Sequence, residues 1–403
     1  MGCPVLLLIC DGMGDRATKG VTPLQAASTP NMDRLASEGS SGLLSPISLG
    51  VPPGSDTSHL AILGYDPRVY YHGRGPLEAL GAGIPLEEGD IALRANFAIV
   101  DDENRVVDRR AGRLPEGGKA LSQALDGLTI GDTQVLFRHT VGHRAVLILR
   151  GQNLSHRVTD SDPHENRPLK RVEPICDDFE SRRTADIINK FISESKNILE
   201  KHPVNLERER RGLPPVNIVL TRGCGVYVKV PPIRERFGVK AVCVAGGALY
   251  KGIAKYLGME VVEVDGATGD KTTNLSAKID AAVKHLNSYD LVFLHIKATD
   301  DFGHDRDFLG KKRFIEKIDR AITPLLEEDV YIIVTADHST PVTVGRHSGD
   351  PTPFLLWGPD VRRDSPQRFD EVSCAGGALG HLLGRDVMSI ILDCLDLAPL
   401  HGA

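Results

Sequence analysis

The chain has 403 residues, of which 41% are hydrophobic and 25% charged, a balance typical of folded globular proteins and unlike that of disordered or membrane proteins. Its formal net charge of -6 offers no broad basic surface for nucleic acid, and no run reaches the roughly 18 apolar residues of a membrane span. Seven cysteines occur without a CxxC pair, which indicates reduced thiols and predicts a cytoplasmic protein.

Short apolar runs that end at polar or glycine-bearing corners recur near both ends of the chain. Each is typical of a buried parallel strand, and helical patterns lie between them. The first run has no basic residues before it, so we expect a strand there rather than an export signal. The predicted strands are 5–9, 241–245, 291–296 and 331–334, and the predicted helices are 30–38, 250–257, 273–286, 312–326 and 386–397. This alternation predicts an α/β fold with a mostly parallel sheet flanked by helices.

Between about 89 and 215 the pattern changes. Strands such as 92–100 and 135–149 alternate polar and apolar residues, and charge clusters appear between them. The sequence therefore predicts an inserted α+β domain at 89–215 within a core domain formed by 1–88 and 216–403. The glycine- and proline-bearing segment 212–215 is the predicted hinge.

Two features near the start of the chain carry candidate chemistry. Asp11 follows the first predicted strand and precedes Gly12, which suits a cation ligand with a close backbone approach, although most such pairs are turns. Ser55 follows a Pro-Pro-Gly corner and precedes a helical pattern, where backbone N–H groups favour a phosphate. Ser55 is either the helix N-cap or a nucleophile, and a serine attacks phosphorus only beside a base or a metal.

Further candidate ligands follow two later predicted strands. Asp300 and His304 stand four residues apart, which places both side chains on one side of a helical turn. Asp337 and His338 directly follow a strand, and His347 comes nine residues after them. Each of these residues is commonplace alone, but the carboxyl ends of parallel strands share one edge of a sheet. We therefore expect these side chains to gather there.

This ligand set combines oxygen and nitrogen atoms without thiolates. Such a set suits Mn, Zn, Co or Mg rather than a structural zinc site. Two such ions about 3.5 to 4 Å apart can activate a serine hydroxyl and hold phosphate oxygens. The presence of these ligands favours Ser55 as a nucleophile over Ser55 as a simple helix cap.

Longer segments extend these motifs over both ends and into the middle of the chain: LLLICDGMGDR, TPLQAASTPNMDRLASEG, PPGSDTSHLAILGYDPRVYYHGRGPLEALGAGI, DRRAGR, ALYKGIAKYLGM, HIKATDDFGHDRDFLGK and TADHSTPVTVGRHSGDPTP. In these segments the sequence resembles the archaeal-type cofactor-independent phosphoglycerate mutases of the alkaline phosphatase superfamily. The resemblance implies an alkaline-phosphatase-like core with an inserted substrate-binding lid. It also implies two divalent metal ions, with Mn first, and no 2,3-bisphosphoglycerate.

The resemblance further implies how the ligands divide between the two ions. Asp11, Ser55, Asp337 and His338 would surround one metal, while Asp300, His304 and His347 would hold the other. A related group with a homoserine-kinase assignment shares this scaffold but tends to lack the histidine four residues after the serine. This chain keeps His59, which argues against that group.

A phosphoglycerate substrate carries a phosphate and a carboxylate, both of which suit arginine. The candidates for binding it are Asp108, Arg109, Arg110, Arg113, His143, Arg144, Arg222 and Lys251. The DRRAGR segment is alternatively a solvated basic turn, and Lys251 is alternatively a solvent-facing helix residue. The expected partner is thus a small molecule, with neither nucleic acid nor a membrane, and the sequence predicts no oligomeric state.

The predicted reaction converts 3-phosphoglycerate to 2-phosphoglycerate through a phosphoserine at Ser55, with the glycerate retained under the lid. If water reached the phosphoserine, the protein would be a phosphohydrolase. That activity, another phosphotransferase of the homoserine-kinase-like group, and a non-catalytic metal-binding relative are the alternatives. The complete ligand set argues against the last of these.

Overall fold

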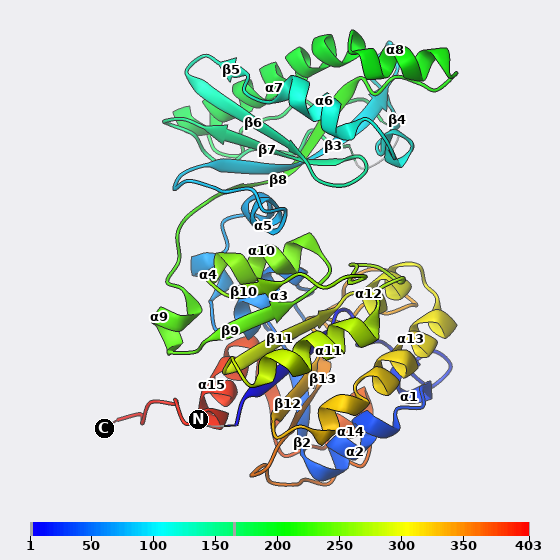
Figure 1. Ribbon diagram of the computed structural model, residues 1–403, viewed down its shortest axis with the longest axis vertical. Helices are drawn as coiled ribbons and strands as arrows, with labels where there is room; N and C mark the ends of the chain where they lie inside the picture. The colour runs from blue at the N-terminus through cyan, green and yellow to red at the C-terminus, as the bar shows by residue number, and fades with distance from the viewer. Residues whose placement is uncertain (1–2, 164–166, 403) are drawn as a thin grey trace. The chain divides into compact units, whose positions relative to one another are not determined.

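The structure is a computed structural model that describes residues 3–163 and 167–402. The chain forms two compact units, which are Met1–Tyr71 with Val230–Ala403, and His72–Lys229. Figure 1 shows the elements of both units along the chain.

The first unit is built on an eight-stranded sheet with the order β10-β9-β11-β1-β12-β13-β2-β14. The pairs from β10 to β12 are parallel, and β13 alone runs antiparallel to both of its neighbours. The strands are β1 (Val5–Cys10), β2 (Ser40–Ser45), β9 (Ala241–Val244), β10 (Glu260–Val262), β11 (Leu291–Ile296), β12 (Tyr331–Thr335), β13 (Thr352–Trp357) and β14 (Gly380–Leu383). The predicted α/β fold with a mostly parallel sheet is confirmed.

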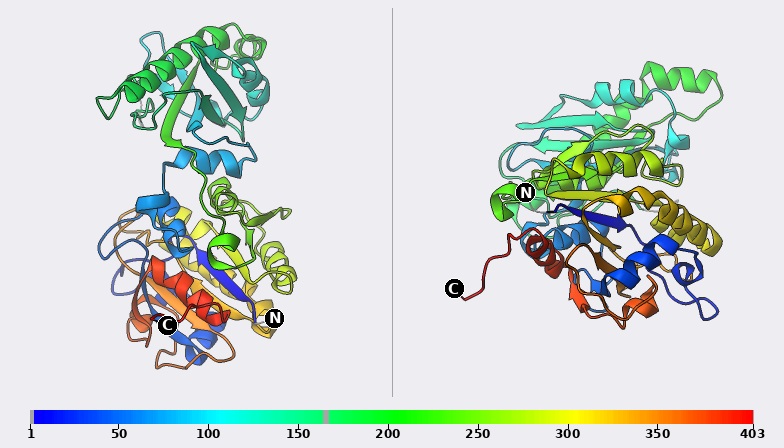
Figure 2. Two further views of the ribbon diagram at one scale, coloured as in Figure 1. Left: turned by 90° about the vertical axis from the view of Figure 1, so that its left-hand side faces the viewer. Right: turned by 60° about the horizontal axis from the view of Figure 1, so that its bottom comes forward.

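Helices cover both faces of this sheet (Figure 2). Leu6, Leu8 and Cys10 of β1 belong to one core with residues of α2, α11 and α13, while α3 contacts α10 and α15. The helices are α1 (Pro23–Ala26), α2 (Pro30–Glu38), α3 (Ser55–Ile62), α4 (Pro67–Tyr70), α9 (Ile233–Phe237), α10 (Ala248–Tyr256), α11 (Leu275–Leu286), α12 (Ala298–His304), α13 (Phe308–Ala321), α14 (Glu371–Cys374) and α15 (Gly384–Cys394), with a 3-10 turn η2 (Thr323–Glu327). The helix predicted at 312–326 corresponds to α13, which starts earlier, at Phe308, and ends at Ala321. The rest of the predicted segment forms the 3-10 turn η2.

The second unit is built on a six-stranded antiparallel sheet with the order β4-β3-β7-β6-β5, in which β8 also pairs with β3. Its elements are α5 (Arg74–Gly81), β3 (Ile91–Val100), β4 (Val106–Asp108), η1 (Ala111–Arg113), α6 (Gly118–Leu125), β5 (Thr129–Ile130), β6 (Thr133–His139), β7 (Arg144–Arg150), α7 (Phe179–Glu200), α8 (Pro203–Arg210) and β8 (Ile218–Val226). The single strand predicted at 135–149 is a hairpin of β6 and β7.

The division between the units differs from the predicted boundaries at 88 and 215. β8 pairs with β3 from Ile218 to Val226, so the predicted hinge at 212–215 lies inside the second unit. α5 also belongs to this unit, because Gly75 packs directly on the backbone of β3. A Cβ at Gly75 would lie 1.9 Å from the carbonyl oxygen of Ala92. Strand pairing between distant segments decides this boundary, and no local turn signal reports it.

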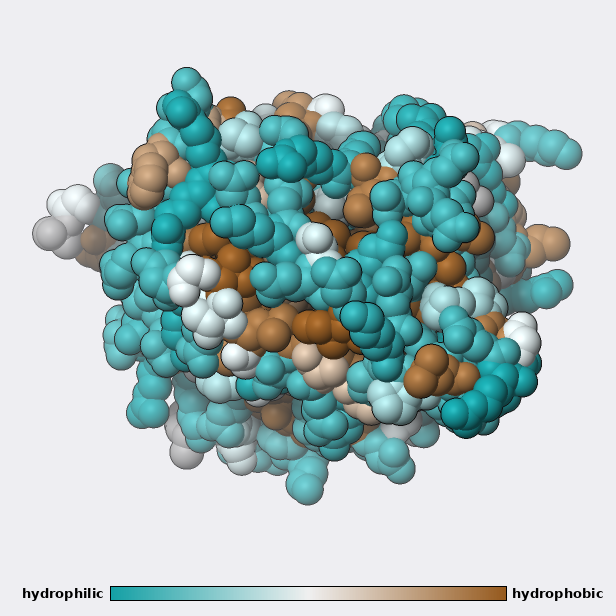
Figure 3. Space-filling view, turned by 90° about the horizontal axis from the view of Figure 1, so that it is seen from above, coloured by the Kyte–Doolittle hydropathy of each residue, from teal (hydrophilic) through white to brown (hydrophobic). Residues whose placement is uncertain are grey.

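Among the described residues, no helix is long and apolar enough to cross a membrane. The face in Figure 3 is mostly hydrophilic, with apolar residues in the furrows between polar side chains. All seven cysteines are free thiols.

Candidate active site

The predicted ligands come together at one edge of the sheet in the first unit. Asp11 follows β1, Asp300 lies in α12 just after β11, and Asp337 and His338 follow β12. These three strands are parallel neighbours, so their carboxyl ends meet. Asp11, Asp337 and His338 offer ligand atoms within 4.8 Å of one another, and so do Asp300, His338 and His347.

Ser55 is the first residue of α3 and is buried. The N-cap of this helix is Gly54, so Ser55 stands one position past the cap, and its Oγ lies 3.1 Å from Nε2 of His338. His59, one turn later, donates from Nδ1 to the Ser55 carbonyl at 2.6 Å. The helix therefore presents Ser55 to the ligand cluster, and the capping alternative loses its main support.

The second group centres on the Asp300 carboxylate. His304 Nε2 lies 3.3 Å from Oδ2 of Asp300, and His347 Nε2 lies 3.6 Å from Oδ1. The other ring nitrogen of His347 donates to the Pro53 carbonyl at 2.8 Å, which fixes the ring orientation. Thr340 donates to Oδ1 of Asp300 at 2.6 Å.

A glycine makes this convergence possible. Gly12 has φ +63°, and a Cβ there would lie 2.7 Å from the Asp300 side chain and 2.7 Å from Thr340 Oγ1. Its N–H donates to Oδ1 of Asp337 at 3.1 Å. The loop after β1 can therefore pass between α12 and the loop after β12 only with glycine at this position.

The pKa values of the three buried carboxylates, Asp11, Asp300 and Asp337, shift in different directions. Burial and the charge of Asp11 raise the pKa of Asp337 to about 7. Burial acts in the same direction on Asp11 and Asp300, but Lys297 and the neighbouring histidines outweigh it and hold both pKa values well below their usual range. Burial lowers the pKa of His338, which leaves a neutral imidazole suited to ligation.

These residues fit divalent metal ions. Three aspartates in one buried site repel one another, and cations relieve that repulsion. Oδ2 of Asp337 is buried and has no hydrogen-bond partner among the described residues, and a buried carboxylate oxygen in that state is costly without a cation. The donor set of carboxylates and imidazoles, without thiolates, matches Mn, Zn, Co or Mg.

Most of the predicted substrate residues lie in the second unit. Asp108 accepts from the N–H groups of Arg110 and Gly112 at 2.7 and 2.6 Å, so it shapes the DRRAGR turn. Burial together with the charges of Arg144 and Arg110 lowers the pKa of His143 to about 4, which places these side chains in one electrostatic group.

A second group in this unit contains Arg222. Arg109 forms an ion pair with the buried Asp162, with its Nε 2.7 Å from Oδ1. Burial lowers the pKa of Arg222, and the charges of Asp162 and Arg109 act on it next. The structure therefore brings Arg109 and Arg222 together around Asp162.

Two predicted substrate residues lie apart from these groups. The Arg113 side chain forms no hydrogen bond or ion pair within the described part of the chain, and Arg113 itself adopts φ +67° in the turn. Lys251 belongs to α10 of the first unit, where its Nζ lies 2.6 Å from Oε2 of Glu263.

Comparison with known proteins shows where this combination of residues occurs. Residues 36–205 match the family model described as 2,3-bisphosphoglycerate-independent phosphoglycerate mutase. Proteins of that name from Methanocaldococcus jannaschii and Methanopyrus kandleri are 47% and 48% identical, each alignment covering 99% of this chain and 98% of the relative. The chain belongs to the 2,3-bisphosphoglycerate-independent phosphoglycerate mutase family. The predicted resemblance is confirmed.

Solved structures of similar proteins support the same conclusion. The cofactor-independent phosphoglycerate mutase from Thermoplasma acidophilum is 37% identical, with a TM-score of 0.71 and coverage of 97% of this chain and 99% of that one. A Pyrococcus horikoshii protein is also 37% identical, with a TM-score of 0.86 and full coverage of both chains. The family name itself excludes 2,3-bisphosphoglycerate as a cofactor.

The structure also shows candidate substrate-binding residues of this phosphoglycerate mutase family member that the sequence did not predict. Arg94 of β3 and Arg74 of α5 both form ion pairs with the partly buried Glu78, at 3.2 and 3.0 Å. Burial lowers the pKa of Arg94 to about 10, and the charges of Arg222 and Arg144 are among the contributors. The available signal for Arg94 was a charged residue inside the predicted strand 92–100. His295, whose Nε2 lies 3.1 Å from Oδ2 of Asp11, was also missed, and its signal was a histidine inside the apolar strand 291–296.

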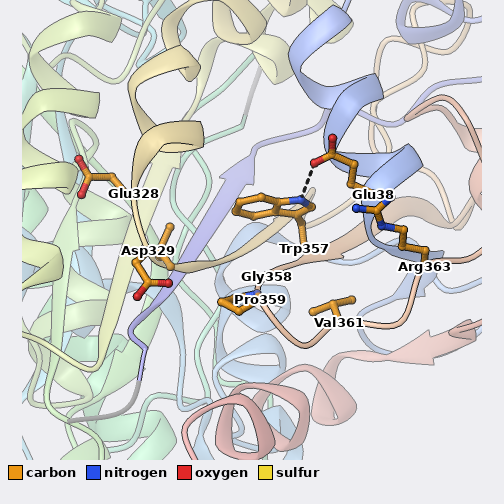
Figure 4. Close-up of a pocket in the computed structure, with 9 residues that line it drawn as sticks. Glu38, Glu328, Asp329, Trp357, Gly358, Pro359, Val361 and Arg363 are labelled. Carbon is orange, nitrogen blue, oxygen red and sulfur yellow. Dashed lines mark hydrogen bonds between the residues drawn. The ribbon is translucent and has the colours of Figure 1, made fainter.

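Two surface pockets in the first unit differ in their relation to this site. A groove of about 510 Å³ borders His347 and is lined by Arg16, Pro52, Val344 and Arg346, among others. A second pocket of about 240 Å³ lies beside Trp357, whose indole N–H donates to Glu38 at 3.3 Å (Figure 4). None of the predicted site residues lines the second pocket, so this pocket is separate from the candidate active site.

Proposed function

We propose that this protein interconverts 3-phosphoglycerate and 2-phosphoglycerate through a phosphoserine at Ser55. The observation that carries the proposal is the position of the Ser55 hydroxyl. It is buried, it is not used as a helix cap, and it lies 3.1 Å from His338 within a cluster of three aspartates. A serine so placed has no evident structural purpose, and it is the residue type that accepts phosphoryl groups.

In this proposal two divalent ions bind at the ligand cluster. Asp11, Ser55, Asp337 and His338 would hold one, and Asp300, His304 and His347 the other. When bound, the ions lower the pKa of the serine hydroxyl and neutralise phosphate oxygens. Mn is our first choice because the family resemblance implies it, and the oxygen and imidazole donors present also suit Zn, Co or Mg.

The protein's own residues then perform two displacements. Ser55 gives up its hydroxyl proton and attacks the phosphorus of the bound ester, and the glycerate oxygen leaves and takes up a proton, so that a phosphoserine and a bound glycerate remain. The other hydroxyl of the glycerate next attacks the phosphoserine and restores Ser55. The position of Ser55 at the first residue of α3 holds its hydroxyl beside the ligand cluster, and the glycerate must stay bound between the two steps.

Retention of the glycerate is assigned to the second unit, which we propose as a substrate-binding lid. Arg94, Arg109, Arg144 and Arg222 supply guanidinium groups there, and Glu78 and Asp162 hold three of the neighbouring arginine side chains in place. Guanidinium groups bind carboxylates and phosphates with two parallel hydrogen bonds.

We propose a cytoplasmic location, supported by the seven free thiols.

The test uses the full chain with Mn²⁺ and 3-phosphoglycerate, and it follows 2-phosphoglycerate and free phosphate together. We expect 2-phosphoglycerate without phosphate. Ser55→Ala should lower turnover more than about 10³-fold, whereas Ser58→Ala on the same helix is the matched control. Ser58 is also buried, and its hydroxyl has no hydrogen-bond partner among the described residues.

Each outcome has a definite meaning. Phosphate release without the isomer would identify a phosphohydrolase and remove the mutase proposal. Full turnover by the Ser55→Ala variant would remove Ser55 from the mechanism. Equal losses in the Ser55→Ala and Ser58→Ala variants would assign both effects to folding of α3.

A further inference from the structure

Two hydrogen-bond donors converge on a single oxygen of Asp11. His295, in β11, has its Nε2 3.1 Å from Oδ2 of Asp11. The Tyr250 hydroxyl, from the first turn of α10, donates to the same Oδ2. A carboxylate only accepts hydrogen bonds, so the His295 tautomer must carry its proton on Nε2.

The other oxygen of Asp11 faces the remaining members of the cluster. Oδ1 lies 3.5 Å from Nε2 of His338 and 3.5 Å from Nζ of Lys297. Asp11 itself is fully buried. The carboxylate is therefore divided, with one oxygen occupied by the two donors and one oxygen directed at the proposed metal.

The two donors hold each other in position. The rings of Tyr250 and His295 stack with centroids 3.4 Å apart and an interplanar angle of 21°. Tyr250 is 3% exposed and His295 is fully buried. Two stacked rings inside a packed core lose little conformational freedom when they form a hydrogen bond, because their side chains are already fixed.

Tyr250 also connects Asp11 to the proposed nucleophile. The connection runs through the ring of His59, one helical turn after Ser55. His59, which donates to the Ser55 carbonyl, packs its ring 5.0 Å from Tyr250 and 5.2 Å from His295. The stacked pair thus contacts a metal ligand on one side and the helix turn that carries the nucleophile on the other.

We propose that Tyr250 and His295 are positioning residues that present Asp11 to the metal through Oδ1 alone and hold Ser55 beside it. The proposal rests on the metal centre of the proposed function. Hydrogen bonds to a metal ligand orient that ligand and tune its basicity, and their loss typically lowers metal affinity about 10- to 100-fold. The two rings act through Asp11 and Ser55 and do not themselves take part in phosphoryl transfer.

The test is the substitution Tyr250→Phe, which keeps the ring stack and removes only the hydroxyl. Its matched control is Tyr256→Phe on the same helix, where the hydroxyl donates instead to the backbone carbonyl of Tyr70 at 3.1 Å. Titration of each metal-free protein with Co²⁺ in a calorimeter gives the affinity. The visible absorption of the bound Co²⁺ reports the ligand geometry independently of any turnover.

We expect the Tyr250→Phe variant to bind one of two Co²⁺ ions about 10-fold more weakly, with an altered absorption spectrum and an unchanged second ion. Its kcat with 3-phosphoglycerate should fall while KM stays the same, because the lost hydrogen bond is to a metal ligand beside the nucleophile and not to the glycerate. The Tyr256→Phe variant should match the wild type in all three measurements. The substitution His295→Asn, which keeps a donor on a shorter side chain, should give a smaller loss of affinity than His295→Leu.

The wild-type titration separates this inference from the proposed function. A wild-type protein that binds no Co²⁺ would overturn the metal centre and this inference with it. Normal Co²⁺ affinity and an unchanged spectrum in the Tyr250→Phe variant would overturn the inference alone. An equal loss in both tyrosine variants would also overturn it, because the effect would then belong to the packing of α10.

Discussion

Replacement of Gly12 by alanine tests whether the loop after β1 sets both the stability of the first unit and the geometry of the metal centre. Gly12 has φ +63°, a conformation that costs an alanine about 1 to 2 kcal/mol. The new methyl group would lie 2.7 Å from Asp300 and from Thr340. Displacing packed side chains in this way costs about 1 to 3 kcal/mol, so we expect a total loss of about 2 to 5 kcal/mol.

Gly380 provides the matched control. Its φ is +66°, and a Cβ at that position would meet nothing within 4 Å. The substitution Gly380→Ala should therefore cost only the backbone contribution of about 1 to 2 kcal/mol. Urea unfolding of the two variants and the wild type gives the free energies of unfolding, and calorimetric Mn²⁺ titration gives the metal affinity.

The difference between the two variants isolates the steric effect at the site. We expect the Gly12→Ala variant to be about 1 to 3 kcal/mol less stable than the Gly380→Ala variant. It should also bind Mn²⁺ more weakly, because Asp300 must move. Equal stability losses, together with wild-type Mn²⁺ affinity in the Gly12→Ala variant, would refute the reasoning.

Three further predictions concern buried charge. Burial raises the pKa of Glu371 from 4.5 to about 7, so between those pH values the folded chain keeps a proton that the unfolded chain has released, and stability falls as the pH rises. In urea unfolding at pH 5 and pH 8, Glu371→Gln should remove up to about 3 kcal/mol of that fall. The same fall in the free energy of unfolding in the variant and the wild type would contradict this prediction. Lys311 is fully buried and pairs with Asp15 at 2.7 Å, so Lys311→Met should cost about 3 to 5 kcal/mol. The neighbouring Lys312→Met breaks only a partly exposed pair with Glu316 and should cost less than about 1 kcal/mol. Chelation of bound metal with EDTA should lower the melting temperature and abolish turnover, and addition of Mn²⁺ should restore both. The reason is that an ion at 100 times its Kd stabilises the folded state by about 2.7 kcal/mol. A melting temperature that EDTA leaves unchanged would contradict a contribution of the metal to stability.

The residues of the candidate metal centre could be selected from the sequence because their signals are local. Asp11, Asp300 and Asp337 each come at or just after the end of a buried apolar run, and parallel strands bring such ends together wherever they lie in the chain. The period of the apolar residues was enough to find the strands. The candidate ligands could therefore be selected without knowing which strands are neighbours in the sheet.

The arginine groups of the second unit were predicted only in part. Arg109, Arg144 and Arg222 were chosen for their motifs and residue type, but Arg94 was passed over because it stands within a strand. Its contact with Glu78 of α5 depends on how that helix packs on β3. Sequence distance and periodicity contain no information on that packing.

The sequence by itself determined the fold class and the family and selected the candidate metal ligands, because each depends on local periodicity or on short motifs. Only the tertiary structure decided that β8 belongs to the antiparallel sheet of the second unit, and that Tyr250 and His295 share one oxygen of Asp11. Both depend on contacts between segments far apart in the chain. Such contacts are fixed by packing and by the pairing of buried polar groups, which no single stretch of sequence specifies.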